Sequence, residues 1–148
     1  MSASIPSCLQ QLIKERLDIT NIIIPEQNDL IIRHKIIRKN MTIFNDLISI
    51  KNDLDSGKQV IICVNNVATA QLVYKKLYVK YQTKLIHGRL NSRSRENAEK
   101  GLKRNQLLIG TQAIEVSLDI SYDVMYTEVA PWDSMLQRFG RVNRKMYL

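Results

Sequence analysis

The sequence predicts an α/β domain with a mainly parallel sheet that is covered by helices on both faces. Three observations predict it: short apolar runs rich in β-branched residues, amphipathic segments, and a regular alternation of the two along the chain. Strands separated by helices at this spacing form βαβ units, whose strands run parallel and are buried. The 148 residues are enough to build one such domain around a sizeable core.

The first clear strand is the continuous apolar run QVIICV at 59–64. Such a run is typical of a strand that is buried on both of its faces. An amphipathic helix follows it, with lysines on one side and apolar residues at helical spacing on the other. These apolar residues are Ala70, Val73, Leu77 and Tyr81.

The later elements continue the alternation of strands and helices. In chain order they are the strand KLIHG at 84–88, the polar helix SRSRENAEKGLKR at 92–104, the strand QLLIG at 106–110 and the strand DVMYTEV at 123–129. Pro131 then opens a last helix that extends through Gln137, because proline is favoured in the first turn of a helix.

Composition excludes several classes of protein. With 45% hydrophobic and 24% charged residues, the chain is typical of a globular protein. No apolar run reaches the roughly 18–20 residues that span a bilayer, so we expect a cytoplasmic protein with no membrane partner. Cys8 and Cys63 form no cluster with metal-ligand spacing, so no metal site is expected, and Cys63 is interpreted as a core thiol. The net charge of +8 indicates a polyanionic partner, or else only a soluble basic surface.

Several residues of interest fall at or just after the ends of the predicted strands. They are Asn65 and Asn66, 87–89 (His-Gly-Arg), Thr111, and 128–130 (Glu-Val-Ala). In open parallel sheets, ligands bind beyond the carboxyl ends of the strands. We therefore expect these residues to line one edge of the sheet and to form the functional site.

Four stretches carry a resemblance to the superfamily 2 helicases. QRFGRVNR at 137–144 resembles their motif VI, TQAIEVSLDI at 111–120 their motif V, VIICVNN at 60–66 their motif IV, and SASIP at 2–6 their motif III. The residues of motif V, together with Ala130-Pro131 and Asp133-Ser134 just before motif VI, are most similar to those of the CRISPR-associated helicases of type I interference. The motifs occur in the family's order and fall on the expected structural elements.

The resemblance implies a three-layer RecA-like domain. It assigns residues 1–25 to the end of a first RecA-like domain, and 26–148 to a second one that lacks its last strand. The chain has no phosphate-binding loop G-x-x-x-x-G-K-[ST], because Gly57-Lys58 is followed by Gln59, and it has no Asp-Glu pair of Walker B type. We therefore expect no ATP hydrolysis by this chain alone.

The arginines of motif VI are the candidate catalytic residues. The resemblance implies that Arg141 and Arg144 contact the γ-phosphate and that Gln137 helps to position them. On one continuous helix these three residues would share a face, Arg138 would lie off it, and Gly140 would leave room for close approach. A solvated basic helix end is the alternative interpretation.

Further residues are assigned from the resemblance. Asp119, with Arg141 and Arg144, would contact ATP, although an aspartate here could instead be a turn residue. Thr111, Asn65, Asn66 and Arg89 would contact the phosphate backbone of nucleic acid. The asparagines could equally cap the helix that begins near Val67.

Other conspicuous side chains receive a structural interpretation. Arg93 and Arg95 could extend a phosphate track, or could simply pair with nearby glutamates along their helix. Trp132 and Tyr126 could stack on bases, but burial near the last helix is the favoured interpretation. His87 is taken as a structural histidine with its hydrogen bonds satisfied.

The resemblance thus implies the C-terminal half of an ATP-dependent DNA helicase of CRISPR interference. ATP and magnesium would be held mainly by an N-terminal RecA-like half, present in cis or as a separate subunit. Single-stranded DNA and a guide-RNA interference complex would be its other partners. The alternative is a RecA-like module that binds nucleic acid or regulates a partner without catalysis.

Overall fold

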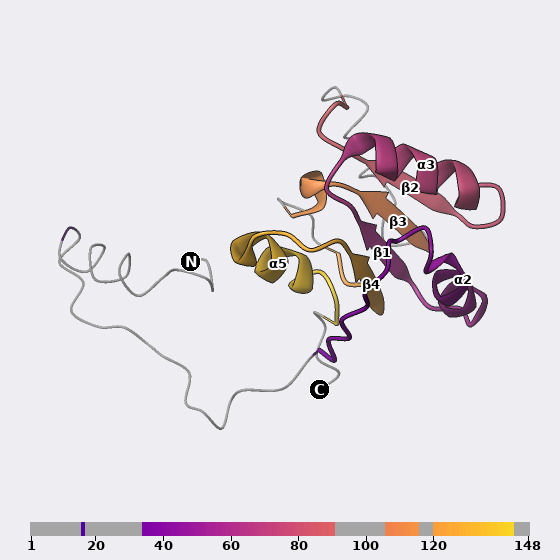
Figure 1. The fold of residues 1–148 in the computed structure, drawn as a ribbon, viewed down its shortest axis with the longest axis horizontal. Helices are drawn as coiled ribbons and strands as arrows, with labels where there is room; N and C mark the ends of the chain where they lie inside the picture. Colours follow the sequence, from indigo (N-terminus) through magenta and orange to yellow (C-terminus); the bar gives the residue numbers. More distant parts are fainter. Residues whose placement is uncertain (1–15, 17–33, 91–105, 116–119, 144–148) are drawn as a thin grey trace. The chain divides into compact units, whose positions relative to one another are not determined.

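The computed structural model describes Arg16 and residues 34–90, 106–115 and 120–143 (Figure 1). The chain divides into two compact units, residues 1–35 and 36–148, and every helix and strand named below belongs to the second. The motif III stretch and the polar helix expected at 92–104 lie outside the described residues.

Four parallel strands form one sheet. They are β1 (Val60–Cys63), β2 (Thr83–Ile86), β3 (Leu107–Gly110) and β4 (Val124–Thr127). Their order in the sheet is β2-β3-β1-β4. At the carboxyl edge, Gly110 of β3 pairs with Cys63 of β1 and with Ile86 of β2, and Cys63 also pairs with Thr127 of β4. The predicted parallel α/β sheet is confirmed, and all four strands end at the same edge.

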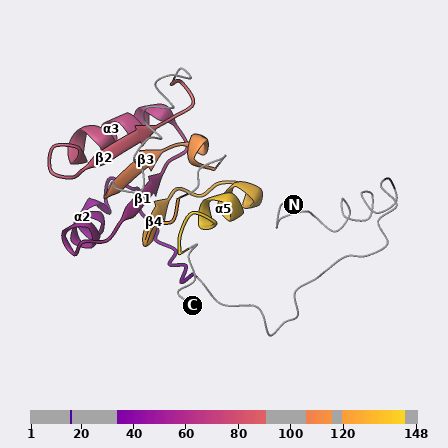
Figure 2. The same cartoon turned by 180° about the vertical axis from the view of Figure 1, so that it is seen from behind.

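Helices flank this sheet. They are α2 (Leu47–Asp55), α3 (Val67–Leu77), the 3-10 turn η3 (Gln112–Ile114) and α5 (Trp132–Phe139). Figures 1 and 2 show α5 next to β4, apart from α2 and α3. Sequence reasoning predicted α3 and α5 but proposed no element for the region of α2.

Helix α3 forms where the sequence predicts it. Asn66 precedes it in an extended conformation, and its side chain accepts a hydrogen bond from the Thr69 N–H at 2.8 Å. This contact satisfies one of the N–H groups that a helix start leaves without a partner. The apolar stripe Ala70, Val73 and Leu77 is buried, as its spacing requires.

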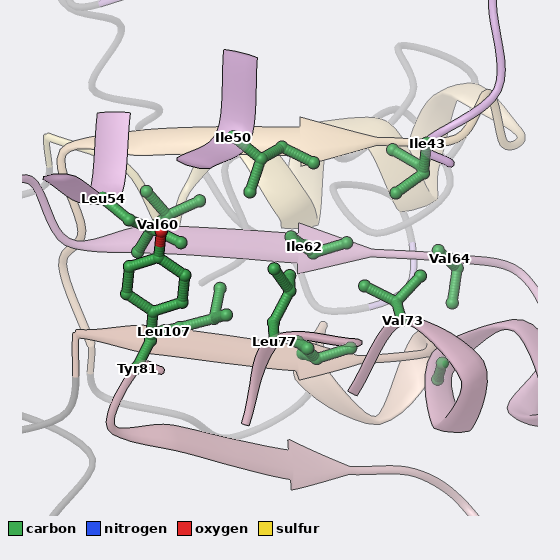
Figure 3. Close-up of a cluster of buried hydrophobic side chains, with 12 residues drawn as sticks. Ile43, Ile50, Leu54, Val60, Ile62, Val64, Val73, Leu77, Tyr81 and Leu107 are labelled. Atoms are coloured by element: carbon green, nitrogen blue, oxygen red, sulfur yellow. The ribbon is translucent and has the colours of Figure 1, made fainter. Parts of the chain in front are cut away.

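The larger core lies between the sheet and the helices α2 and α3 (Figure 3). Its side chains come from α2 and the segment before it, from β1 and β3, and from α3 and the turn after it. The fully buried members include Ile50, Val60, Ile62, Val64, Val73, Leu77 and Leu107. Burying one such side chain stabilises a fold by about 1.5–3 kcal/mol.

The opposite face of the sheet carries a second core. It is formed by Ile61, Ile86, Leu108, Ile114, Ile120 and Tyr122. Ile61 alternates with Val60 and Ile62 of the first core, so β1 is buried on both faces, as its continuous apolar run predicts. Burial raises the pKa of the Tyr122 hydroxyl above its ordinary value.

The chain leaves its helix earlier than the arginine spacing suggests. α5 ends at Phe139, and beyond it Tyr122 and Val142 form an isolated parallel bridge, with the Tyr122 N–H donating to the Arg141 carbonyl at 3.0 Å. The expectation that Gln137 and Arg141 share a helical face is therefore wrong, because pairing beside β4 replaces the helix. A Cβ on Gly140 would make only ordinary contacts, so among the described residues no close approach requires this glycine.

The two aromatic residues considered for stacking differ from each other. Trp132 is 67% exposed, so the favoured burial of its side chain is wrong. It is the first residue of α5. Tyr126 is half-buried against the first core, and its hydroxyl donates to Asp53 Oδ2 in α2 at 2.7 Å. None of the described helices has the length and apolarity needed to cross a membrane.

Candidate functional site

The segments that follow β1, β3 and β4 contact one another at the carboxyl edge of the sheet. The Asn65 N–H donates to Glu128 Oε2 at 2.6 Å, which links the ends of β1 and β4. Gln112 Nε2 donates to the Asn65 carbonyl at 3.2 Å, which links the ends of β3 and β1. The predicted convergence of these segments is confirmed.

The Asn65 side chain links the end of β1 to the segment after β4 and to α5. Its Nδ2 donates to the Val129 carbonyl at 2.8 Å, and its Oδ1 accepts from Arg138 Nη2 at 3.1 Å. Both ends of the side-chain amide are thus engaged within the protein. Contact of Asn65 with nucleic acid stays a prediction, and in this arrangement the amide holds the edge together.

The other residues assigned to nucleic-acid contact have different surroundings. The Asn66 side chain caps α3, which confirms the capping interpretation for this asparagine. Thr111 is 3% exposed and begins the turn η3, whereas Arg89 is exposed. His87 is buried, and its Nδ1 has no hydrogen-bond partner among the described residues, so the satisfied structural histidine that was expected is not observed there.

Arg138 is the one charged side chain in the described residues that is fully buried. Its Nε donates to Glu115 Oε1 at 2.9 Å, and the two residues form an ion pair. Nη1 donates to Thr127 Oγ1 at 2.8 Å and to the Glu128 carbonyl at 2.9 Å. With the bond to Asn65, this guanidinium holds the ends of β1 and β4 and the turn after β3 against α5.

Arg141 lies one turn beyond Arg138 and is only half-buried. Its Nη2 donates to the Glu115 carbonyl at 2.7 Å. Gln137 is exposed on α5. The structure therefore brings Arg141 to the motif V turn, whereas Arg144 and Asp119 lie outside the described residues.

Cys63 ends β1 beside this site and is buried. Burial raises the pKa of its thiol to about 12, and the Sγ–H group faces the Thr111 carbonyl at 3.7 Å. A thiol is nucleophilic only as the thiolate, so this cysteine is inert at neutral pH. The interpretation of Cys63 as a core thiol is confirmed.

One protein-family model matches more than half of the chain. Residues 56–147 match the family model described as CRISPR-associated nuclease/helicase Cas3, C-terminal. The chain belongs to this Cas3 C-terminal family. Curated relatives include the CRISPR-associated nuclease/helicase Cas3 of Methanothermobacter thermautotrophicus, 35% identical over 118 residues, which cover 69% of this chain and 14% of that protein. The Cas3 helicase of Thermoproteus tenax is 34% identical over 99 residues, covering 62% of this chain and 17% of that protein.

Solved structures of Cas3 show the same fold. T. fusca Cas3 with ADP matches with a TM-score of 0.57 and 28% identity, over 68% of this chain and 14% of that chain. S. cerevisiae Dbp5, bound to RNA and ADP BeF3, matches with a TM-score of 0.67 over 95% of this chain and 40% of that chain. At 18% identity the Dbp5 match shows the RecA-like fold alone. The chain spans about a sixth of the length of the curated Cas3 relatives named above.

Sequence reasoning missed two residues, Arg138 and Glu115, that organise this edge of the sheet. The spacing of motif VI places Arg138 off the functional face, and the resemblance gives Glu115 of motif V no role. Burial of an arginine requires an acidic partner. An acidic residue just after a buried strand, in a chain whose last helix carries arginines, is the signal that could have suggested the pair.

Proposed function

We propose that this chain works as the C-terminal RecA-like half of an ATP-dependent nucleic-acid translocase in CRISPR interference. In this proposal it presents Arg141 to ATP that is bound mainly by an N-terminal half. Membership of the Cas3 C-terminal family supports it. Two structures similar to this chain add support: T. fusca Cas3 with AMPPNP, at 26% identity, and a CRISPR RNA-guided surveillance complex before nicking, at 27% identity.

The contrast between the two neighbouring arginines is the observation that carries the proposal. Arg138 is fully buried in an ion pair and cannot reach a ligand. Arg141 is half-buried, and its Nη2 donates to the Glu115 carbonyl, a neutral acceptor that leaves the positive charge of the guanidinium able to attract a phosphate oxygen. An arginine placed at a transferring phosphoryl group accelerates hydrolysis by roughly 10³ to 10⁵.

The remaining nucleotide contacts are part of the proposal. Arg144 and Asp119 would complete the contacts with ATP, and Gln137, exposed on α5, would help to orient Arg141. Magnesium would neutralise charge on the phosphates. Its carboxylate ligands would come from the N-terminal half, because the sequence of this chain has no Asp-Glu pair of Walker B type.

Single-stranded DNA would lie along the carboxyl edge of the sheet. Arg89 is exposed and would meet phosphates with its side chain. Thr111, Asn65 and Asn66 would be the other contacts to the strand, and Asn65 and Asn66 would exchange the present protein partners of their side-chain amides for phosphate. Contacts to the phosphate backbone are independent of sequence, which suits a motor that moves along a strand.

Reconstitution tests this function. The 148-residue chain is mixed with an N-terminal half that carries the phosphate-binding loop and Walker B, and ATP hydrolysis is measured with single-stranded DNA. We expect hydrolysis that neither half shows alone, and a loss of about 10³-fold in kcat for Arg141→Ala. Arg38→Ala removes an exposed arginine far along the chain and serves as the matched control.

If the reconstituted wild type and Arg141→Ala hydrolyse ATP at the same rate, the proposed role of this arginine is wrong. If the chain binds single-stranded DNA with a steep salt dependence but supports no turnover with any N-terminal half, the non-catalytic module is the correct interpretation.

A further inference from the structure

Glu115 makes two contacts that connect the buried arginine with the candidate catalytic one. Its carboxylate accepts from Arg138 Nε at 2.9 Å, and its backbone carbonyl accepts from Arg141 Nη2 at 2.7 Å. The residue directly follows η3, and its side chain is 11% exposed. Both acceptors belong to one residue, whose N–H also donates to the Gln112 carbonyl at 3.0 Å, so the contact between the carboxylate and Arg138 is one of the restraints on the residue whose carbonyl holds Arg141.

The backbone of Arg141 is fixed by other contacts. Its carbonyl accepts from the Tyr122 N–H at 3.0 Å, and its N–H donates to the Arg138 carbonyl at 2.9 Å. These bonds place the Cα of Arg141 independently of Glu115. A long side chain can still adopt many rotamers from a fixed Cα. What the Glu115 carbonyl adds is therefore the direction of the guanidinium.

The ion pair behind Glu115 is rigid for electrostatic reasons. Arg138 is fully buried, so loss of its acidic partner would leave a buried charge without compensation, which is strongly destabilising. Three further hydrogen bonds, to Thr127, Glu128 and Asn65, prevent its guanidinium from following a displaced carboxylate. By contrast, the solvent-accessible pair Lys58–Asp53, also short at 2.7 Å, contributes little.

We propose that Arg138 and Glu115 are positioning residues for Arg141. Arg138 fixes the Glu115 carboxylate, and the Glu115 carbonyl directs the Arg141 guanidinium toward the ligand. The inference rests on the proposed function in one respect, namely that Arg141 faces ATP. We call this series of contacts, from Arg138 through Glu115 to Arg141, the relay. It lies within this chain, so it can be measured without ATP.

The first test uses NMR hydrogen exchange of arginine side chains in the full 148-residue chain. We expect the guanidinium protons of Arg141 to exchange with water more slowly than those of exposed Arg38. Glu115→Ala keeps the backbone carbonyl but removes the carboxylate, and it should raise the Arg141 exchange rate severalfold. Asp53→Ala removes a carboxylate from the Lys58 pair and should leave that rate unchanged.

Two results of this test would overturn the relay. One is that, in the wild-type chain, the guanidinium protons of Arg141 exchange with water as fast as those of Arg38. This result requires no variant. The other is unchanged protection of Arg141 in a folded Glu115→Ala protein. If that variant does not fold, Glu115→Gln replaces it: the amide oxygen can still accept from Arg138 but the ion pair is lost, so a smaller rise in the Arg141 exchange rate is expected, and no rise would overturn the inference.

The second test separates positioning from general stability in the reconstituted ATPase. Glu115→Ala should lower kcat by about 100-fold, the usual cost of a small misplacement, with little change in the KM for ATP. The double variant with Arg141→Ala should be no slower than Arg141→Ala alone, because the relay acts only through Arg141. If the two losses multiply, Glu115 acts by another route and the inference is wrong.

The two proposals fail in different ways. Absence of turnover with the wild-type chain counts against the proposed function, and the exchange measurement then still decides the relay. If ATP turnover depends on Arg141 but the Arg141 guanidinium protons exchange as fast as those of Arg38, the proposed function is supported and the relay is wrong.

Discussion

Gly110, the last residue of β3, leaves no room for a side chain. A Cβ there would clash with the carbonyl oxygen of Ile86 and would lie 2.7 Å from Cδ1 and 2.8 Å from Cγ1 of Ile114. The Ile86 carbonyl is held in the sheet by the Thr111 N–H at 3.2 Å, so it cannot retreat easily. Overpacking costs about 1–3 kcal/mol, and the lower unfolded-state entropy of alanine returns about 0.4–1 kcal/mol. We expect Gly110→Ala to lose about 1–2 kcal/mol of unfolding free energy.

Urea unfolding measures this loss as a lower midpoint with an unchanged slope. Gly140→Ala is the matched control, because a Cβ there would lie 3.5 Å from the Gln137 carbonyl oxygen and the φ angle of −62° suits alanine. This control should unfold at the wild-type midpoint or slightly above it. A Gly110→Ala midpoint equal to that of wild type, or an equal loss in both variants, would refute the steric argument.

Three further outcomes are expected. Asn66→Ala should lower the unfolding free energy by about 1 kcal/mol in urea, and Asn66→Asp should not, because the helix cap is lost only in the first; equal midpoints would contradict the cap. In a Cys8→Ser background, Cys63 should resist a thiol reagent at mildly alkaline pH until the chain unfolds, because its pKa is raised to about 12; rapid labelling of Cys63 in the folded chain would contradict its burial. Burial raises the pKa of Asp53, but hydrogen bonds from Lys58 and Tyr126 outweigh it and the pKa lies below its ordinary value. Its stabilisation is therefore present above the unfolded pKa and is lost as pH falls through the folded one, so Asp53→Asn should lose less stability than wild type on acidification; identical pH profiles would contradict this.

The parts of the fold that depend on local sequence were predictable. The β-branched run of β1 and the apolar stripe of α3 specify their elements through periodicity, and Asn66 caps its helix through a contact only three residues away. Parallel pairing then follows from the alternation of strands and helices, and it places the carboxyl ends of all four strands at one edge.

The arrangement of the arginines was not predictable from spacing. Spacing assumes a continuous helix, but α5 ends at Phe139 because the following residues bond with Tyr122, a partner almost twenty positions earlier in the chain. The burial of Arg138 likewise depends on Glu115 and on Asn65, the latter 73 residues away. Sequence reasoning missed α2 for a similar reason. Its buried residues Ile50 and Leu54 belong to the first core, whose other members lie far away in the sequence.

The exposed position of Trp132 gives the chain an intrinsic optical signal. It is the only tryptophan in 148 residues, so the fluorescence of its indole reports on a single place. That place is the first turn of α5, the helix that also carries Arg138 near its other end. With 67% of the side chain in water, the emission starts from a polar environment, and any strand or protein half that docks there shifts it to the blue or quenches it. Assembly on this edge can thus be followed in real time without a label.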